Sequence, residues 1–299
     1  MLSIYETIET VARDLYWKAL KDIPEDVRTA LRSGLAAERG AGNATAEQVM
    51  FTILENIRTA GEQDTLVCQD TGLPVYKVLV GSRLQLDIPE LESRLRAGCE
   101  RATREYPLRS NSVHPLTRKN TQTNTGRGLP IIKLNFVPSS DEIEIHMAPK
   151  GSGSENMSFL KMLNPSEGRK GIKKFVLQCI FESGAQPCPP MIVGVGLGGT
   201  SDVAMELAKD ASTFRKVGSV DADPDVAQLE CELLEKINQT GIGPQGLGGA
   251  ITALAVNIEW AHTHISQNPV AVNIQCWRGE RASARISTDG KITYGNGAS

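Results

Sequence analysis

The sequence predicts an α+β fold that is largely helical, carries short mixed or antiparallel β-sheets, and is not a Rossmann fold. Apolar residues recur at helical spacing over long stretches, as they do between Ile4 and Ala19. Short apolar runs such as Val270 to Cys276 are typical of buried strands. The two kinds of element do not alternate in the regular order that would build a doubly wound parallel sheet.

In the first half of the chain, apolar spacing and turn residues define most elements. Thr45-Ala46-Glu47-Gln48 has the form of a capping box, which starts a helix. Leu108 to Pro130 is polar and lacks apolar periodicity, which indicates a functional or mobile segment. The predicted elements are a helix over 4–19, a helix from 45, a strand over 74–80, a helix over 88–105, and a β-hairpin of 131–137 with 143–147.

In the second half, the same patterns predict more helices and a closing hairpin. Lys150 to Asn156 reads as a glycine-rich loop that enters a helix near Met157. The remaining predictions are helices over 168–183, 202–211, 224–239 and 247–260, strands over 192–195 and 270–276, and a hairpin over 281–294.

Composition excludes several classes of protein. The 299 residues are 40% hydrophobic and 22% charged, as in ordinary globular proteins, and we expect a single domain over residues 1–299. A net charge of −3 gives no case for binding nucleic acid or a membrane. The N-terminus lacks the features of a signal peptide, so we expect a cytoplasmic location. Six cysteines in a reducing compartment do not predict disulfides.

The six cysteines fall into two groups. Cys68, Cys188 and Cys276 stand beside turn-forming or acid–base residues. The other three lie within helical patterns; these are Cys99, Cys179 and Cys231. Cys68 and Cys188, each taken alone, are equally consistent with an inert cysteine, and Cys276 alone is better explained as a core residue. Gathered by the fold, three thiolates could hold one metal centre and leave a coordination position open for substrate.

A glycine motif offers a different function. Gly194-x-Gly196-x-x-Gly199 matches the spacing of the dinucleotide fingerprint, which would make the chain an NAD-binding oxidoreductase. The fingerprint also requires a second strand that ends in an acidic residue about 20 residues later. The chain there reads Lys216 to Pro224, which is turn-like, so the motif argues only weakly for NAD. Backbone N–H groups at such a loop could still bind an anion.

Other polar residues suit small anions. Arg109 follows a proline and could hold a carboxylate through two hydrogen bonds, although a solvated surface arginine is the simpler interpretation. Lys150 and the adjacent glycines could hold a second carboxylate, and Gly241 to Gly249 is another permissive loop. His262 and His264 are better suited to hydrogen bonding or the surface than to metal ligation.

Five motifs, in this order, resemble the class I, iron–sulfur-dependent fumarate hydratase/tartrate dehydratase family over nearly the whole chain. They are Cys68-Gln69-Asp70-Thr71-Gly72, Lys150 to Asn156, Cys188-Pro189-Pro190, Gly241 to Gly249, and Pro269 to Trp277. The resemblance implies that Cys68, Cys188 and Cys276 ligate three irons of a [4Fe–4S] cluster. The fourth iron would bind substrate and act as a Lewis acid that improves hydroxide as a leaving group.

The resemblance also assigns roles to residues that are not ligands. Gln69 and Asp70 would line the substrate pocket, with Asp70 in the acid–base relay. Arg109 would clamp a carboxylate of a small dicarboxylate substrate. One of the glycines after Lys150, Gly151 or Gly153, would donate a backbone N–H.

Finally, the resemblance implies a partner and a reaction. The chain resembles a free-standing α subunit, so the residue that removes the carbon-bound proton would come from a β subunit in a heterotetramer or other hetero-oligomer. Ser154-Glu155-Asn156 favours reversible hydration of fumarate to (S)-malate over dehydration of L(+)-tartrate or hydration of mesaconate. Ser152, where we expect glycine, and His114, where we expect an acidic residue, depart from the pattern. A subunit that only binds or stores a cluster is the non-enzymatic alternative.

Overall fold

The computed structural model describes residues 3–295, which form two compact units. Within the described part, the first unit comprises residues 3–24, 59–152 and 280–295, and the second comprises 25–58 and 153–279. The single domain expected over residues 1–299 stays a prediction. The secondary structure confirms an α+β fold that mixes helices with open sheets.

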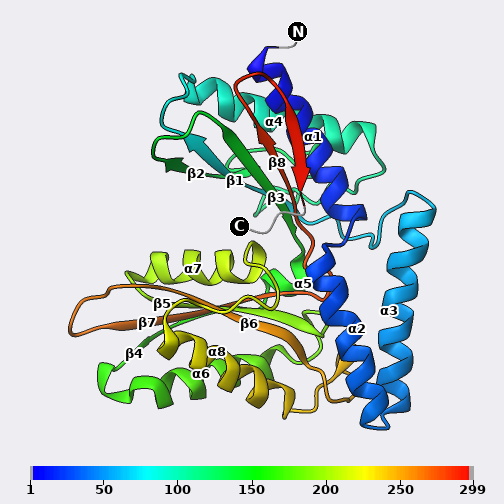
Figure 1. The fold of residues 1–299 in the computed structure, drawn as a ribbon, viewed down its shortest axis with the longest axis vertical. Coiled ribbons are helices and arrows are strands. Elements are labelled where there is room, and N and C mark those ends of the chain that lie inside the picture. Colours follow the sequence, from blue (N-terminus) through cyan, green and yellow to red (C-terminus); the bar gives the residue numbers. More distant parts are fainter. Residues whose placement is uncertain (1–2, 296–299) are drawn as a thin grey trace. The chain divides into compact units, whose positions relative to one another are not determined.

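The first unit is built on a five-stranded sheet of order β2-β1-β3-β8-β9 (Figure 1). β2 runs parallel to β1, and the other neighbouring pairs are antiparallel. Helix α1 packs on β3 and β8, and α4 packs beside α1. The bounds are α1 Ile4–Lys21, β1 Leu73–Gly81, α4 Ile88–Glu105, β2 Ile131–Val137, β3 Ile143–Lys150, β8 Ala282–Ile286 and β9 Ile292–Gly295.

Local sequence explains why α1 forms and which face it buries. Ser3 and Glu6 complete a capping box, which satisfies backbone N–H groups at the first turn. The apolar stripe from Ile8 to Ala19 is buried and joins a core with Val78, Ile145 and other inward-facing strand residues. The spacing-based prediction of this helix is therefore confirmed.

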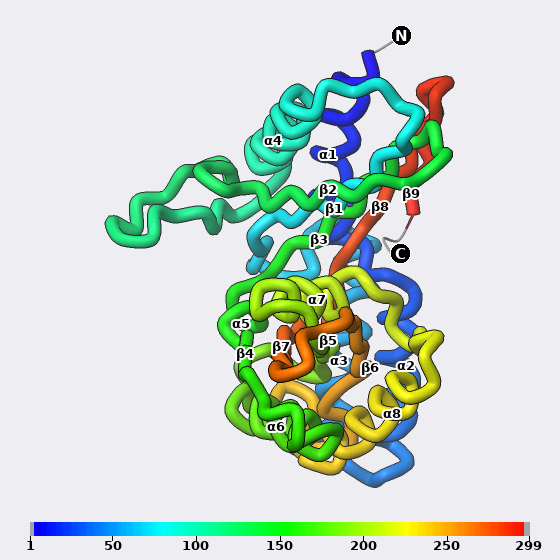
Figure 2. Tube along the Cα trace, turned by 90° about the vertical axis from the view of Figure 1, so that its left-hand side faces the viewer, coloured from blue at the N-terminus to red at the C-terminus, as the bar shows by residue number. Residues whose placement is uncertain are grey.

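Residues 108–130 form an arm that projects from the first unit (Figure 2). The arm has no named helix or strand; its regular pairing is limited to the isolated bridges Val113–Asn120 and Gly126–Leu129. Leu116, near the tip, is 86% exposed, whereas Asn124 at the base is fully buried. The sequence correctly predicted a polar, irregular segment here.

The second unit is built on a four-stranded sheet of order β4-β7-β5-β6. α7 packs on one face, and α6 and α8 lie on the other (Figures 1 and 2). β5 and β6 are parallel, while β7 is antiparallel to both of its neighbours. The bounds are α2 Glu25–Gly40, α3 Ala44–Glu62, α5 Ser152–Glu155, β4 Ser158–Leu163, η1 Pro165–Glu167, α6 Gly168–Ser183, β5 Met191–Gly198, α7 Ser201–Thr213, α8 Pro224–Asn238, η2 Pro244–Gly246, β6 Ala253–Ala261 and β7 Asn268–Gln275.

Four local predictions are wrong. β2 and β3 do not form a hairpin, because β1 lies between them and pairs with both. The chain after Met157 forms strand β4 on the edge of the second sheet. Residues 253–261 form strand β6, where the parallel pairing with β5 overrides the helical pattern. The helix predicted to be capped at Thr45 begins one residue earlier, at Ala44.

Across residues 3–295, none of the helices has the length and apolar character needed to cross a bilayer.

Candidate functional site

The first unit fixes the turn that contains Cys68, Gln69 and Asp70. The buried hydroxyl of Tyr16 donates to the carbonyl oxygens of Thr71 at 3.0 Å and Gly72 at 3.2 Å. Burial raises the pKa of Tyr16 well above its ordinary value, so this hydroxyl stays a donor. Gly72 has φ +62°, and a Cβ there would lie 2.7 Å from the backbone nitrogen of Lys150. Glycine therefore lets the turn approach the end of β3 closely.

Two backbone N–H groups orient the carboxylate of Asp70. Gly72 donates to Oδ1 at 3.0 Å, and Ser152 donates to Oδ2 at 3.1 Å. The neighbouring Gln69 is exposed, while Cys68 and Asp70 are half-buried. The turn therefore presents an amide, a thiol and an oriented carboxylate at accessible positions.

The backbone of Arg109 is hydrogen-bonded to this turn. Its carbonyl oxygen accepts from Thr71 Oγ1 at 2.7 Å and from Asn124 Nδ2 at 3.0 Å, while the residue itself is exposed. Asn111 donates through Nδ2 to Thr71 Oγ1 at 2.9 Å and to the Gly72 carbonyl at 3.1 Å. The first unit thus brings together three predicted elements of the site: the Cys68–Gly72 turn, Arg109, and the loop through Gly151.

Asn111 and Asn124 were missed as site residues by sequence reasoning. Asn124 Oδ1 also accepts the backbone N–H of Asn111 at 2.7 Å, so one buried amide fixes the whole turn around Arg109. Its φ of +54° is a conformation that asparagine tolerates better than most residues. The only signal in the sequence is the density of Asn and Thr between Leu108 and Pro130.

In the second unit, the segments that carry Cys188 and Cys276 are neighbours. The N–H of Trp277 donates to the carbonyl oxygen of Cys188 at 3.3 Å. Cys188 has φ +55° and is exposed, and Cys276 is half-buried just beyond the end of β7. Gln245 donates to the Pro189 carbonyl at 2.8 Å, which ties the predicted Gly241–Gly249 loop to the Cys188 segment.

The loop after Gly151 reaches the same part of the second unit. A Cβ on Gly153 would lie 2.9 Å from the carbonyl oxygen of Gln186, two residues before Cys188. Ser154 Oγ donates at 3.3 Å to Gln275 Oε1, one residue before Cys276. Glu155 is held by an ion pair with Lys209 and by a 3.2 Å hydrogen bond from Asn273. Segments of three predicted motifs therefore meet here.

The remaining cysteines occupy helices, as the sequence predicted. Burial raises the pKa of Cys179 in α6 to about 12 and also raises that of Cys99 in α4. Cys231 is exposed on α8. Among residues 3–295, no group of three or more His, Cys, Asp and Glu side chains is gathered as a metal site. Two of the three predicted ligands, Cys188 and Cys276, lie in contacting segments of the second unit.

The glycine motif is a packing device rather than a nucleotide loop. Gly194 and Gly196 lie inside β5, not in the turn that follows it. A Cβ at these positions would lie 2.1 Å from the Ala208 carbonyl oxygen and 1.9 Å from that of Ala204, respectively, and both alanines lie on α7. The glycines therefore let α7 sit directly on the strand. The dinucleotide fingerprint, which requires its glycines in the strand-to-helix turn, is not matched.

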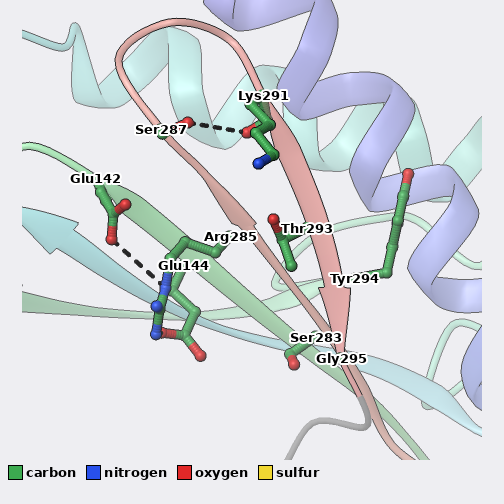
Figure 3. Close-up of a pocket in the computed structure, with 9 residues that line it drawn as sticks. All are labelled: Glu142, Glu144, Ser283, Arg285, Ser287, Lys291, Thr293, Tyr294 and Gly295. Carbon is green, nitrogen blue, oxygen red and sulfur yellow. Dashed lines mark hydrogen bonds and ion pairs between the residues drawn. The ribbon is translucent and has the colours of Figure 1, made fainter.

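A separate hollow of about 440 Å³ lies on β3, β8 and β9 of the first unit (Figure 3). Arg285 is one of its lining residues and forms ion pairs with Glu144 at 3.1 Å and with Glu142 at 3.5 Å. None of the site residues predicted from the sequence lines this hollow. The hollow is therefore separate from the two groups of motif segments described above.

Comparison with known proteins identifies the family. The family model described as "Fumarate hydratase (Fumerase)" matches residues 9–285. The chain belongs to the fumarate hydratase family. It is 47% identical over 287 residues to "Putative L(+)-tartrate dehydratase subunit alpha" of Methanocaldococcus jannaschii, covering 95% of this chain and 99% of the relative. It is also 37% identical to "L(+)-tartrate dehydratase subunit alpha" of Escherichia coli (strain UTI89 / UPEC) and 36% identical to the Shigella sonnei protein of that name, each over 92% of this chain and 88% of the relative.

Membership of the fumarate hydratase family makes the chain a hydro-lyase and confirms the resemblance stated from its motifs. The matched region, residues 9–285, contains all eight predicted site residues. The family model is named for fumarate and the relatives are named for tartrate, so the comparisons leave the choice between the two substrates open.

Proposed function

We propose that this chain is the α subunit of an iron–sulfur hydro-lyase that hydrates fumarate reversibly to (S)-malate. One observation carries the proposal: the oriented carboxylate of Asp70 and the exposed Arg109 belong to segments joined by direct hydrogen bonds in the first unit. A small dicarboxylate requires a cation for its charge and an acid–base group near its reacting carbon. In this proposal Arg109 would supply the cation and Asp70 the acid–base group.

The donor set fits an iron–sulfur cluster. Thiolates are the usual ligands of such clusters, and Cys68, Cys188 and Cys276 are accessible thiols on turns or beyond a strand end. Cys99 and Cys179, by contrast, are buried in helices with raised pKa values. We assign a [4Fe–4S] cluster to the first three. When bound, the cluster would supply an iron without a protein ligand, a Lewis acid for the departing or entering hydroxyl.

The chain's own residues would bind and orient the substrate. The guanidinium of Arg109 would hold one carboxylate through two hydrogen bonds. A backbone N–H of Gly151 or Gly153 would hold the other, and Gln69 would add a side-chain contact. Asp70 would exchange a proton at a carboxylate oxygen, while Gly72 and Ser152 keep the group in one orientation.

A partner subunit completes the proposal. The similar proteins from M. jannaschii and E. coli are named as α subunits, which supports a separate β subunit for this chain. We assign the base that removes the carbon-bound proton to that partner. The isolated chain is then expected to hold the cluster but to show no turnover.

Dehydration of L(+)-tartrate is the second candidate. The names of the similar proteins favour it, because each refers to tartrate. Tartrate is also a four-carbon dicarboxylate that loses a hydroxyl, so the same cation, carboxylate and open metal position would serve. Ser154-Glu155-Asn156 is our reason for placing fumarate first.

The test combines cluster loading with turnover. The chain is co-expressed with its β subunit, purified anaerobically, and assayed with fumarate, L(+)-tartrate and mesaconate. Serine replacements of Cys68, Cys188 or Cys276 should remove the brown, oxygen-sensitive chromophore, and matched replacements of Cys99, Cys179 or Cys231 should keep it. A colourless wild-type protein that binds NAD would overturn the proposal, and a coloured protein without turnover would indicate a cluster carrier.

A further inference from the structure

Gln275 is a buried amide that uses only one of its two polar ends. It is 1% exposed, and its Oε1 accepts from Ser154 Oγ at 3.3 Å. Its Nε2 is buried and has no hydrogen-bond partner among the residues that the structure describes. Buried donors are almost always satisfied, so a donor of this kind points to an acceptor that protein atoms do not supply.

The neighbouring polar residue on the same strand is fully hydrogen-bonded. Asn273 precedes Gln275 by two residues, so their side chains leave β7 on the same face. The amide of Asn273 is fully used: Nδ2 donates to Glu155 and Ser158, and Oδ1 accepts from Ser212. On this face of β7, the amide of Asn273 is therefore fully hydrogen-bonded, whereas the amide of Gln275 has an unused donor.

The position of Gln275 indicates what the acceptor is. It directly precedes Cys276, and Ser154 connects it to the loop that contains Gly153. Both features belong to the proposed function, on which this inference rests: the thiol as a cluster ligand, and the loop as a carboxylate binder. The acceptor could therefore be sulfur of the cluster or of its thiolate ligand, or a carboxylate of the substrate. Both are anionic and accept hydrogen bonds from N–H groups.

We propose that Gln275 is a positioning residue whose Nε2–H donates to an anionic acceptor held at the Cys276 end of β7. Ser154 holds the other end of the amide, so the donor direction is fixed before the acceptor arrives. A preorganised donor of this kind stabilises negative charge without reorganising.

Gln275→Glu removes the donor and adds a charge, and Gln275→Met, measured beside it, removes the donor without adding a charge. The carboxylate keeps an acceptor for Ser154 Oγ but replaces the N–H with negative charge. Asn257→Leu is the matched control, since Asn257 is a buried amide of the same sheet, on β6. Its Nδ2 donates to the Ala211 carbonyl at 3.0 Å, and its Oδ1 also lacks a partner among the described residues. An effect shared by both variants is due to the lost donor, and if one of them does not fold, the other still lacks the donor. Each protein is loaded with iron and sulfide without oxygen and combined with the β subunit.

Two readouts distinguish the sources of the acceptor. A donor to sulfur should make the cluster midpoint potential of Gln275→Glu more negative than that of wild type, with KM unchanged. A donor to substrate should raise KM about tenfold or more, because a hydrogen bond to a charged group is lost, with the potential unchanged. Either result supports the proposal, provided that Asn257→Leu changes neither. Wild-type potential and KM in Gln275→Glu would overturn it. A wild-type chain that takes up no cluster would overturn the proposed function itself, which separates the two failures.

Discussion

The backbone N–H of Ser152 donates a hydrogen bond to Oδ2 of Asp70 across 3.1 Å. Ser152 stands where the resemblance to the family predicted a glycine, so its side chain could have disturbed the site. Its Oγ lies 3.5 Å from the same oxygen and adds little, because hydrogen bonds weaken at this length. The backbone, together with Gly72 on Oδ1, therefore sets the orientation of the carboxylate.

Asp70→Asn should lower kcat by about 10²- to 10⁴-fold, the usual contribution of an acid–base group. The amide cannot accept a proton as the carboxylate does, and its NH₂ would face one of the two backbone donors. Cluster absorbance should be unchanged. Anaerobic turnover of the complex with the β subunit measures the effect. Ser152→Ala, which keeps the backbone N–H, should match wild type, and full activity in Asp70→Asn would remove Asp70 from the mechanism.

Tyr16→Phe should lower the free energy of unfolding by about 1–3 kcal/mol, because it leaves the buried carbonyl of Thr71 without its tyrosine donor. Gly72 keeps a hydrogen bond from Asn111, so the turn is weakened rather than lost. Urea unfolding measures the change. Tyr294→Phe is the control: this hydroxyl donates to Asp14 at the surface, and the change should stay within about 0.5 kcal/mol.

The stabilising effect of Tyr16 should also depend on pH in a definite direction. Burial raises the folded-state pKa of Tyr16, so above about pH 10 the unfolded chain binds fewer protons at this group than the folded chain does. The contribution is complete below that pH and declines as pH rises. The difference in stability between wild type and Tyr16→Phe should therefore shrink in alkaline buffer. A stability difference between the two proteins that does not change with pH would contradict the raised pKa of Tyr16.

Gly196→Ala should destabilise the second unit by about 1–3 kcal/mol or more, because the new methyl would lie 1.9 Å from the Ala204 carbonyl oxygen and force α7 away from β5. Gly61→Ala is a control with the opposite sign. No atom lies within 4 Å of a Cβ at this helical position, so about 0.5–1 kcal/mol of stabilisation is expected. Thermal unfolding compares the two, and a Gly196→Ala protein as stable as wild type would contradict this packing.

Thiol labelling should separate the cysteines by burial. In the metal-free chain at neutral pH, iodoacetamide should modify the exposed Cys188 and Cys231 but spare Cys179, whose pKa of about 12 keeps it protonated. Cys99, with a raised pKa and no exposure, should also react only after unfolding. Loading the cluster should protect Cys188 and leave Cys231 reactive. Equal labelling of these two in the loaded chain would argue against Cys188 as a ligand.

Sequence predicted the elements whose pattern is local. The helices over 88–105 and 168–183 have the predicted bounds, because the apolar spacing that predicts them lies within the segment itself. The predicted hairpin of β2 and β3 failed because β1, some fifty residues earlier in the chain, inserts between them. Pairing between distant strands has no local signature, and β6 was missed for the same reason.

The candidate site shows the same division. Motifs identified Asp70, Arg109 and the cysteines, because their residue types carry recognisable chemistry. The residues that hold these groups were not predictable: Tyr16 and Asn124 act through backbone carbonyls far away in sequence. Their identity as hydrogen-bond donors follows only from the fold, although Asn124 lies in a segment that composition marked as unusual.

The glycines of β5 have a consequence for how such chains are recognised. Gly194 and Gly196 alternate with valine and leucine, so one side of the strand is bare and the other is fully apolar. A pattern search that scores glycine spacing alone would assign this hydro-lyase to the nucleotide-binding proteins. The distinguishing criterion is positional: Gly194 and Gly196 lie within the strand and admit a helix, whereas the fingerprint begins in the turn after the strand. Applied to other sequences, that single check would remove a class of false assignments.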